Sequence, residues 1–148
     1  MKTLTPINSM SYGFRIERTA KKIKQTLQKR FNENNIDLTV DQWVILDHLY
    51  QSNGLSQNEL ADYTFKDAPT VTRIIDLLCK KELTHREVDE DDRRKFRVFL
   101  SSKGKRQVEQ ALPIVRFLRV QGRQGISEPD YAVLLKVLDK VFENFDED

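Results

Sequence analysis

The segment from Asp67 to Lys81 carries hydroxyl and guanidinium groups at a spacing that suits contact with a nucleic acid. A helix advances about 100° per residue, so this segment would place an apolar arc opposite a polar arc. The apolar arc consists of Val71, Ile74, Ile75 and Leu78, and the polar arc of Pro69, Thr72, Arg73, Asp76 and Lys80, with Thr70 at the flank. In a DNA major groove, arginine can bind guanine and threonine can contact a thymine methyl or a phosphate. The alternative is an ordinary surface helix with a polar outer face.

A charged turn from Asp89 to Arg94 offers a second group of candidate contacts. Arg93 and Arg94 can enter a narrow minor groove, where negative potential is concentrated. Four acids in the same turn would repel phosphates, so this interpretation requires Asp92 to pair with Arg94 and the other acids to point away. The alternative is a solvated turn whose ion pairs contribute about 1 kcal/mol or less.

Capping residues and hydrophobic spacing predict the helices that must position these side chains. A long amphipathic helix is expected from Ser9 to Asn34, with apolar residues three and four apart. Thr39 and Ser56 each begin a capping box, and Asp67 caps the helix described above. The two short helices that begin at Ser56 and Asp67 form a helix-turn-helix.

The second half of the chain predicts a hairpin followed by two helices. Period-two alternation indicates a strand at Lys95–Leu100, with which Leu83–Glu87 can pair as a hairpin. Ser101 can cap the next helix, which we expect to bend or stop near Pro113. Ser127 can cap the last helix, which carries apolar residues at helical spacing.

In order and spacing, residues Thr39–Lys105 resemble the winged helix-turn-helix of the MarR family of bacterial transcription regulators. The matching strings are Leu38–Leu46, Ser56–Ala61, Thr70–Leu78, Asp92–Arg94 and Leu100–Gly104. The resemblance implies a mainly α fold with a small β-hairpin wing, in a single domain spanning residues 1–148. It also implies a DNA-binding lobe at 38–105 and a helical dimerisation lobe at 9–34 and 106–148. The chain is then expected to be a homodimer.

The resemblance also implies which residues contact DNA. The helix-turn-helix contacts fall on Thr70, Thr72 and Arg73, and the Asp-x-Arg motif of the wing falls on Asp92 and Arg94. Ser56 and Gln57, at the start of the preceding helix, would face phosphate. The chain departs from the family's pattern at Pro69, which replaces a frequent serine or threonine of the DNA-facing turn. It departs again at Glu82, where many relatives have the glycine that closes this helix.

The function implied is a sequence-specific regulator of transcription that binds double-stranded DNA at a pseudo-palindrome, with repression controlled by a small ligand. Members of the family suggest an anionic or phenolic effector, for which Arg15, Arg18 and Trp43 are candidate contacts. A role in the core is the favoured alternative for Trp43. Two other functions stay open: a regulator of the same fold without an effector, and a winged-helix module that binds an acidic protein.

Composition and charge narrow the classes of protein to which this chain can belong. The 148 residues have a net charge of only +2, but basic residues concentrate in 2–30 and 93–106 and acids in 128–148. No apolar run reaches the ~20 residues that a membrane span needs, and no signal peptide is evident at the start, so a cytoplasmic protein is expected. One cysteine, Cys79, and two distant histidines, His48 and His85, argue against disulfides and bound metal. No cofactor or catalytic motif is found, so we expect no enzyme.

Overall fold

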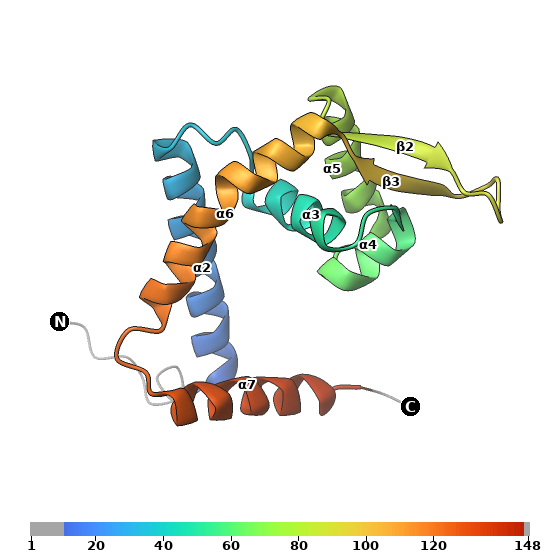
Figure 1. Ribbon diagram of the computed structural model, residues 1–148. Helices are drawn as coiled ribbons and strands as arrows, with labels where there is room; N and C mark the ends of the chain where they lie inside the picture. Colours follow the sequence, from blue (N-terminus) through green and yellow to red (C-terminus); the bar gives the residue numbers. More distant parts are fainter. Residues whose placement is uncertain (1–10, 147–148) are drawn as a thin grey trace. The chain divides into compact units, whose positions relative to one another are not determined.

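The computed structural model describes residues 11–146, as six helices and three short strands. The elements in chain order are α2 (Tyr12–Glu33), α3 (Val40–Gln51), β1 (Leu55–Ser56), α4 (Gln57–Thr64), α5 (Ala68–Lys80), β2 (Thr84–Val88), β3 (Phe96–Leu100), α6 (Ser102–Gly122) and α7 (Glu128–Glu143) (Figure 1). Contacts divide the chain into two compact units, residues 1–114 and 115–148. The expected fold class, mainly α with a β-hairpin wing, is therefore confirmed.

The boundary between the two compact units differs from the expected division of the chain. The unit 1–114 includes α2 together with the helix-turn-helix, whereas the sequence assigned 9–34 and 106–148 to a common dimerisation lobe. A single chain does not test that lobe, so it stays a prediction. Residues 9 and 10, where the first helix was expected to begin, lie outside the described residues.

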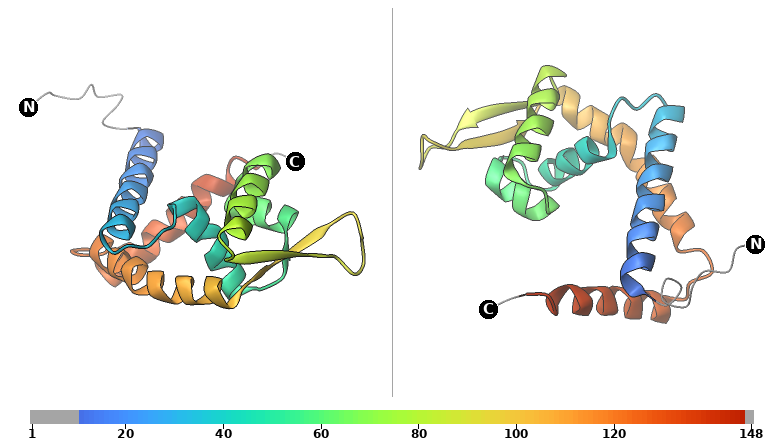
Figure 2. Two further views of the ribbon diagram at one scale, coloured as in Figure 1. Left: turned by 90° about the horizontal axis from the view of Figure 1, so that it is seen from above. Right: turned by 180° about the vertical axis from the view of Figure 1, so that it is seen from behind.

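The three strands form one antiparallel sheet in the order β1-β3-β2. The expected hairpin is present, and in it Thr84 pairs with Leu100 and Val88 with Phe96. The hairpin projects beyond α3, α4 and α5 (Figures 1 and 2). The sequence analysis missed β1, which pairs Leu55 with Val98 but contains only two residues. A period-two pattern cannot be recognised over so short a segment.

The core of the first unit fixes the orientation of α5. Val71, Ile75 and Leu78 are fully buried, whereas Ile74 at the margin of the arc is only half-buried. Neighbouring elements contribute further fully buried side chains, namely Phe31, Ile45, Leu46, Leu49, Leu60 and Val98. Burial of each such side chain stabilises the fold by roughly 1.5–3 kcal/mol. The opposite, polar arc of α5 is thereby left at the surface.

Capping residues begin the helices as predicted. Thr39 and Ser56 each form a complete capping box, with Gln42 and Glu59 respectively bonding back to the backbone N–H of the cap. The side chain of Asp67 accepts the N–H of Thr70 at 2.8 Å and so caps α5. Ser11 caps α2, so that helix begins at Tyr12 rather than at the expected Ser9.

Of the two outcomes expected near Pro113, a bend or a stop, the stop does not occur, because α6 continues to Gly122. A proline inside a helix removes one N–H···O bond and leaves the carbonyl four residues earlier without its donor. Pro113 and that earlier residue, Glu109, are both exposed, so water can satisfy the carbonyl. The helix ends instead at the two glycines that the sequence offered, with Gly125 at a φ of 78°.

Glu82 closes α5 in the backbone conformation that glycine adopts most easily. Its φ is 63°, in the left-handed region. The N–H of Leu83 donates to the carbonyl of Leu78 at 2.9 Å, and the N–H of Glu82 donates to that of Cys79 at 3.0 Å. These two bonds form a Schellman motif, and the buried side chains of Leu78 and Leu83 supply its usual apolar residues. The missing glycine therefore leaves the helix end intact, at the cost of backbone strain.

We expect Glu82→Gly to raise the free energy of unfolding by roughly 0.5–1 kcal/mol, because it relieves the left-handed strain of a residue with a Cβ. Lys80→Gly, two residues earlier in ordinary helical conformation, is the matched control. It should lower the free energy of unfolding by roughly 1 kcal/mol. Urea denaturation measures both, and a loss of stability in Glu82→Gly would contradict the assignment.

Asp41 ties three segments of the first unit together. Its carboxylate accepts from Lys24 of α2 at 3.1 Å and from Lys66, before α5, at 2.8 Å. Burial raises the pKa of Asp41, but the hydrogen bonds and charges of Lys66 and Lys24 lower the pKa by more, so the net shift is downward. The ionised carboxylate therefore stabilises the folded state.

Asp41→Asn should lower the free energy of unfolding near neutral pH by roughly 0.5–1 kcal/mol, a value that allows for the partial exposure of these ion pairs. Because the folded-state pKa is lower than the ordinary value of 3.8, the contribution is complete above that value. It disappears as the pH falls through the folded-state pKa. Urea denaturation from about pH 5 to about pH 2 should therefore show the difference shrinking, and a constant difference would contradict this role. Asp62→Asn, at an exposed aspartate of α4, is the control.

Among the described residues, the structure contains no helix that is both long and apolar enough to span a membrane.

Candidate nucleic-acid interface

The exposed arc of α5 presents its groups in a fixed arrangement at the start of the helix. Arg73 is exposed, and its Nη2 donates to the hydroxyl oxygen of Thr70 at 3.3 Å. The backbone N–H of Thr70 bonds to Asp67, and this bond lowers the pKa of the Asp67 carboxyl. Pro69, at the second position of the helix, is exposed beside them. A guanidinium and a hydroxyl are thus available on the face opposite the core.

Thr72 is half-buried, and other protein groups engage its hydroxyl. The hydroxyl donates to the carbonyl of Ala68 at 3.0 Å and accepts from Nε2 of Gln57 at 3.2 Å. A hydroxyl has one proton to donate, and here that proton is directed to Ala68. The sequence placed Thr72 correctly on the polar arc but could not reveal these partners.

The start of α4 lies beside the wing. A notch of about 130 Å³ joins the two, and its walls are formed by Ser56, Gln57, Asn58, Arg94, Lys95 and Phe96. Helix amino-termini favour anions because their first backbone N–H groups have no partner within the helix and the helix dipole is positive there. The structure therefore brings two predicted groups together, Ser56 and Gln57 from the helix and Arg94 from the wing.

Arg86 is a residue of this surface that the sequence analysis missed. From β2 its Nε donates to Oε1 of Gln57 at 2.7 Å, and its Nη2 donates to Oδ1 of Asp76 on α5 at 2.6 Å. Its side chain is only 24% exposed. The available signal was its position in the strand, because alternation places Arg86 on the same side of β2 as the buried Thr84.

The wing turn has the pairing that its interpretation required. The backbone N–H and Nε of Arg94 each donate to Oδ1 of Asp92 at 3.1 Å, and Nη2 donates to Oδ2 at 3.2 Å. The side-chain hydrogen bonds from Arg94 are the main cause that lowers the pKa of Asp92. The Arg94 side chain is 90% exposed, so its guanidinium is held by one partner and otherwise faces solvent. Arg93 is also exposed in this turn.

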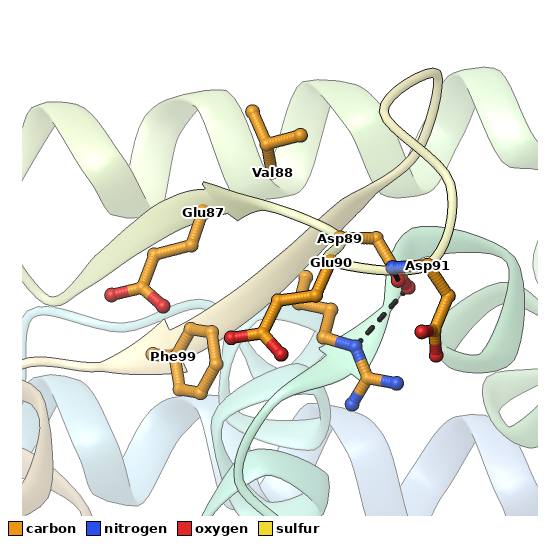
Figure 3. Close-up of a pocket in the computed structure, with 7 residues that line it drawn as sticks. Glu87, Val88, Asp89, Glu90, Asp91 and Phe99 are labelled. Atoms are coloured by element: carbon orange, nitrogen blue, oxygen red, sulfur yellow. Dashed lines mark hydrogen bonds and ion pairs between the residues drawn. The ribbon is translucent and has the colours of Figure 1, made fainter.

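The other acids of the turn gather on one side of the hairpin. Asp89 is buried, and its carboxylate accepts the N–H of Asp91 at 2.8 Å and Nε of Arg97 at 3.2 Å. A hollow of about 310 Å³ lies here, and Figure 3 shows Glu87 and Glu90 on the side of Phe99, with Val88 pointing away from it. Arg86 lies two residues before Val88 in β2 and so shares the opposite side. The side of the hairpin that carries Arg86 is therefore separated from these carboxylates.

The three candidate effector contacts lie in different surroundings. Trp43 is only 4% exposed and packs edge-on against Phe31, with ring centroids 6.1 Å apart, as the alternative role in the core predicted. Arg18 lines a surface hollow of about 470 Å³ on α2 together with Thr19, Lys22 and Ile23. Arg15 is exposed on α2 and is not among the residues that line this hollow.

The cysteine and the histidines take part in local contacts. The sulfur of the partly buried Cys79 lies 3.3 Å from the hydroxyl of Thr84. His48 stacks on Tyr63, and His85 stacks on Phe99. Within residues 11–146 no group of three or more His, Cys, Asp or Glu side chains is placed to hold a metal ion.

The helix-turn-helix with its projecting hairpin defines the class of this unit as a winged helix-turn-helix. Residues 36–95 match the sequence model of the MarR family. The chain is also similar to an uncharacterised HTH-type transcriptional regulator, YsmB, of Bacillus subtilis (strain 168). The two are 29% identical over 99 residues, which are 66% of this chain and 68% of that relative.

Solved structures agree with this match. A crystal structure of the MepR–DNA complex of S. aureus is 25% identical with a TM-score of 0.84, covering 92% of this chain and 99% of that one. A probable transcriptional regulator from Pseudomonas aeruginosa is 27% identical with a TM-score of 0.77, covering 90% of this chain and 98% of that one. The chain therefore has the fold of a winged helix-turn-helix protein, and its residues 36–95 are similar to the MarR family.

Proposed function

We propose that this protein regulates transcription by binding double-stranded DNA as a homodimer. In each copy the polar arc of α5 enters a major groove, and the wing turn enters the adjacent minor groove. The observation that carries this proposal is the exposed guanidinium of Arg73, bonded to the half-buried hydroxyl of Thr70, on the face opposite the buried Val71, Ile75 and Leu78. The match to a relative whose structure is a complex with DNA supports the same placement.

Exposed apolar surface on α2 and α7 supports the homodimer. The apolar stripe of α2 is buried at Leu27 and Phe31, yet it continues through Ile16 and Ile23, which are 41% and 53% exposed. None of the sixteen residues of α7, all of which the structure describes, is buried. The exposed apolar side chains of α7 are Val133, Leu134, Leu135, Val137, Leu138 and Phe142. Contiguous apolar surface of this kind marks an interaction site, and a second copy of the chain is the occupant that we propose.

Control by a ligand is a further part of the proposal. The hollow on α2 places the cations of Arg18 and Lys22 beside the apolar Ile23, a combination that suits a small anionic or phenolic effector. Such a ligand would favour one spacing between the α5 helices of the two copies, the recognition helices of the dimer, over another. The change of spacing would relieve repression. A regulator without an effector is the alternative, and it predicts that no such ligand releases the protein from DNA.

Selection of bound sequences from a pool of random duplexes tests DNA binding directly. We expect a pseudo-palindrome with half-sites about 10–10.5 bp apart. The affinity for this selected duplex should fall steeply with salt, because bound phosphates release counterions. Absence of affinity for any duplex at low salt would contradict the proposal and favour a module that binds an acidic protein.

In the same assay Arg73→Ala should cost on the order of 1–3 kcal/mol of binding and relax the preference at one base pair. The reason is that a guanidinium on this face can bind guanine bidentately. Lys80→Ala, at the far end of the polar arc, is the control and should leave the preference unchanged. An equal loss on all sequences would show that Arg73 contacts phosphate and would contradict base recognition.

Asp92→Asn separates two roles of the acid in the wing. Removing a negative charge would by itself strengthen binding to every duplex. If Asp92 instead orients Arg94, the variant should lose preference for A·T-rich flanks, as Arg94→Ala should, because a narrow minor groove attracts an inserted arginine. Competition between duplexes that differ only in their flanks measures this preference. A uniform gain of affinity in Asp92→Asn, with flank preference intact, would contradict the orienting role.

A further inference from the structure

A chain of hydrogen bonds connects the wing strand to the recognition helix. Arg86 of β2 donates through Nε to Oε1 of Gln57, and Gln57 donates through Nε2 to the hydroxyl of Thr72, at 2.7 and 3.2 Å. The same guanidinium donates to Asp76, one turn further along α5, at 2.6 Å. One arginine therefore contacts both the first residue of α4 and the polar arc of α5.

The hydrogen bond from Arg86 also fixes the orientation of the Gln57 side-chain amide. Since an arginine has only donors, the carbonyl oxygen of Gln57 must face it, and the amide nitrogen is then directed to Thr72. Thr72 in turn directs its single proton to the carbonyl of Ala68 at 3.0 Å. Because its proton is engaged, the hydroxyl cannot donate to a base or a phosphate. The γ-methyl is then the group of Thr72 that can contact DNA.

We propose that Arg86 is a positioning residue of the DNA interface. Through Gln57 it holds the hydroxyl of Thr72 inward, so that α5 meets the major groove with the Thr72 methyl group, which suits a thymine methyl. This inference rests on the proposed binding of DNA. If so, discrimination between DNA sequences by α5 depends on Arg86. The charge of this arginine neutralises Asp76 and does not neutralise a phosphate of the DNA.

The test uses the full-length protein and two probes, a duplex selected from a random pool and a scrambled duplex of the same composition. Arg86→Lys keeps the positive charge but loses the forked pair of donors to Gln57 and Asp76. We expect the ratio of affinities for the two duplexes to fall on the order of tenfold, with the salt dependence of binding unchanged. Asp76→Asn is the matched control, because it removes the negative charge of one partner of Arg86 but keeps an oxygen that can accept from it, and it leaves the bond to Gln57. It should change both affinities by the same factor.

Combining Arg86→Lys with Thr72→Val tests whether the two residues act as one unit. Thr72→Val keeps the methyl group but cannot hold the hydrogen bond to Gln57, so the double variant should discriminate no worse than Arg86→Lys alone. Thermal unfolding of each variant identifies any loss that comes from misfolding. Two results would overturn the proposal: additive losses, or a slope of log affinity against log salt that falls by about 1 in the charge-removing variant Arg86→Gln, the mark of a direct phosphate contact. Failure of the wild-type protein to prefer either duplex would instead contradict the proposed function.

Discussion

The burial of one face of α5 is the constraint on which the rest of the structure depends. Val71, Ile75 and Leu78 are inaccessible to solvent, so the helix cannot rotate about its axis without exposing them. Because this face is fixed, the opposite side of the helix faces outward, with Arg73 exposed there and Thr70 half-buried at its edge. The hydrophobic core and the polar surface of α5 are therefore two results of the same sequence pattern, and one cannot change orientation without the other.

Acidic side chains of the wing and of α5 lie beside the surface that we propose binds DNA, and three of them are paired with arginines. Asp89 is buried under Arg97, where it also closes the turn by accepting the N–H of Asp91. Asp92 is occupied by Arg94. Arg86 neutralises Asp76 on the recognition helix in the same manner. Each of these three carboxylates thus positions an arginine side chain, and the arginine neutralises its negative charge.

Most of the structure that could be predicted from the sequence depends on interactions between residues close together in the chain. The capping boxes at Thr39 and Ser56, the cap at Asp67 and the alternation in β3 depend on neighbours in sequence, and all were predicted from the residues. Features that depend on residues far apart in the sequence were not predicted. The two-residue strand β1 is defined only by its pairing with β3, and the role of Arg86 is defined by Gln57, 29 positions away. Pro113 failed as a stop signal because an exposed helix tolerates one missing hydrogen bond.

Chemical interference by base methylation tests most directly whether α5 enters the major groove twice per assembly. Guanine N7 faces the major groove and adenine N3 the minor groove, so methylation at each reports on a different element. On the selected duplex, we expect interference at guanine N7 in two half-sites about 10–10.5 bp apart, and at adenine N3 in the flanks where the wings insert. Interference confined to one half-site, or to the minor groove alone, would contradict a dimer that binds DNA through two recognition helices.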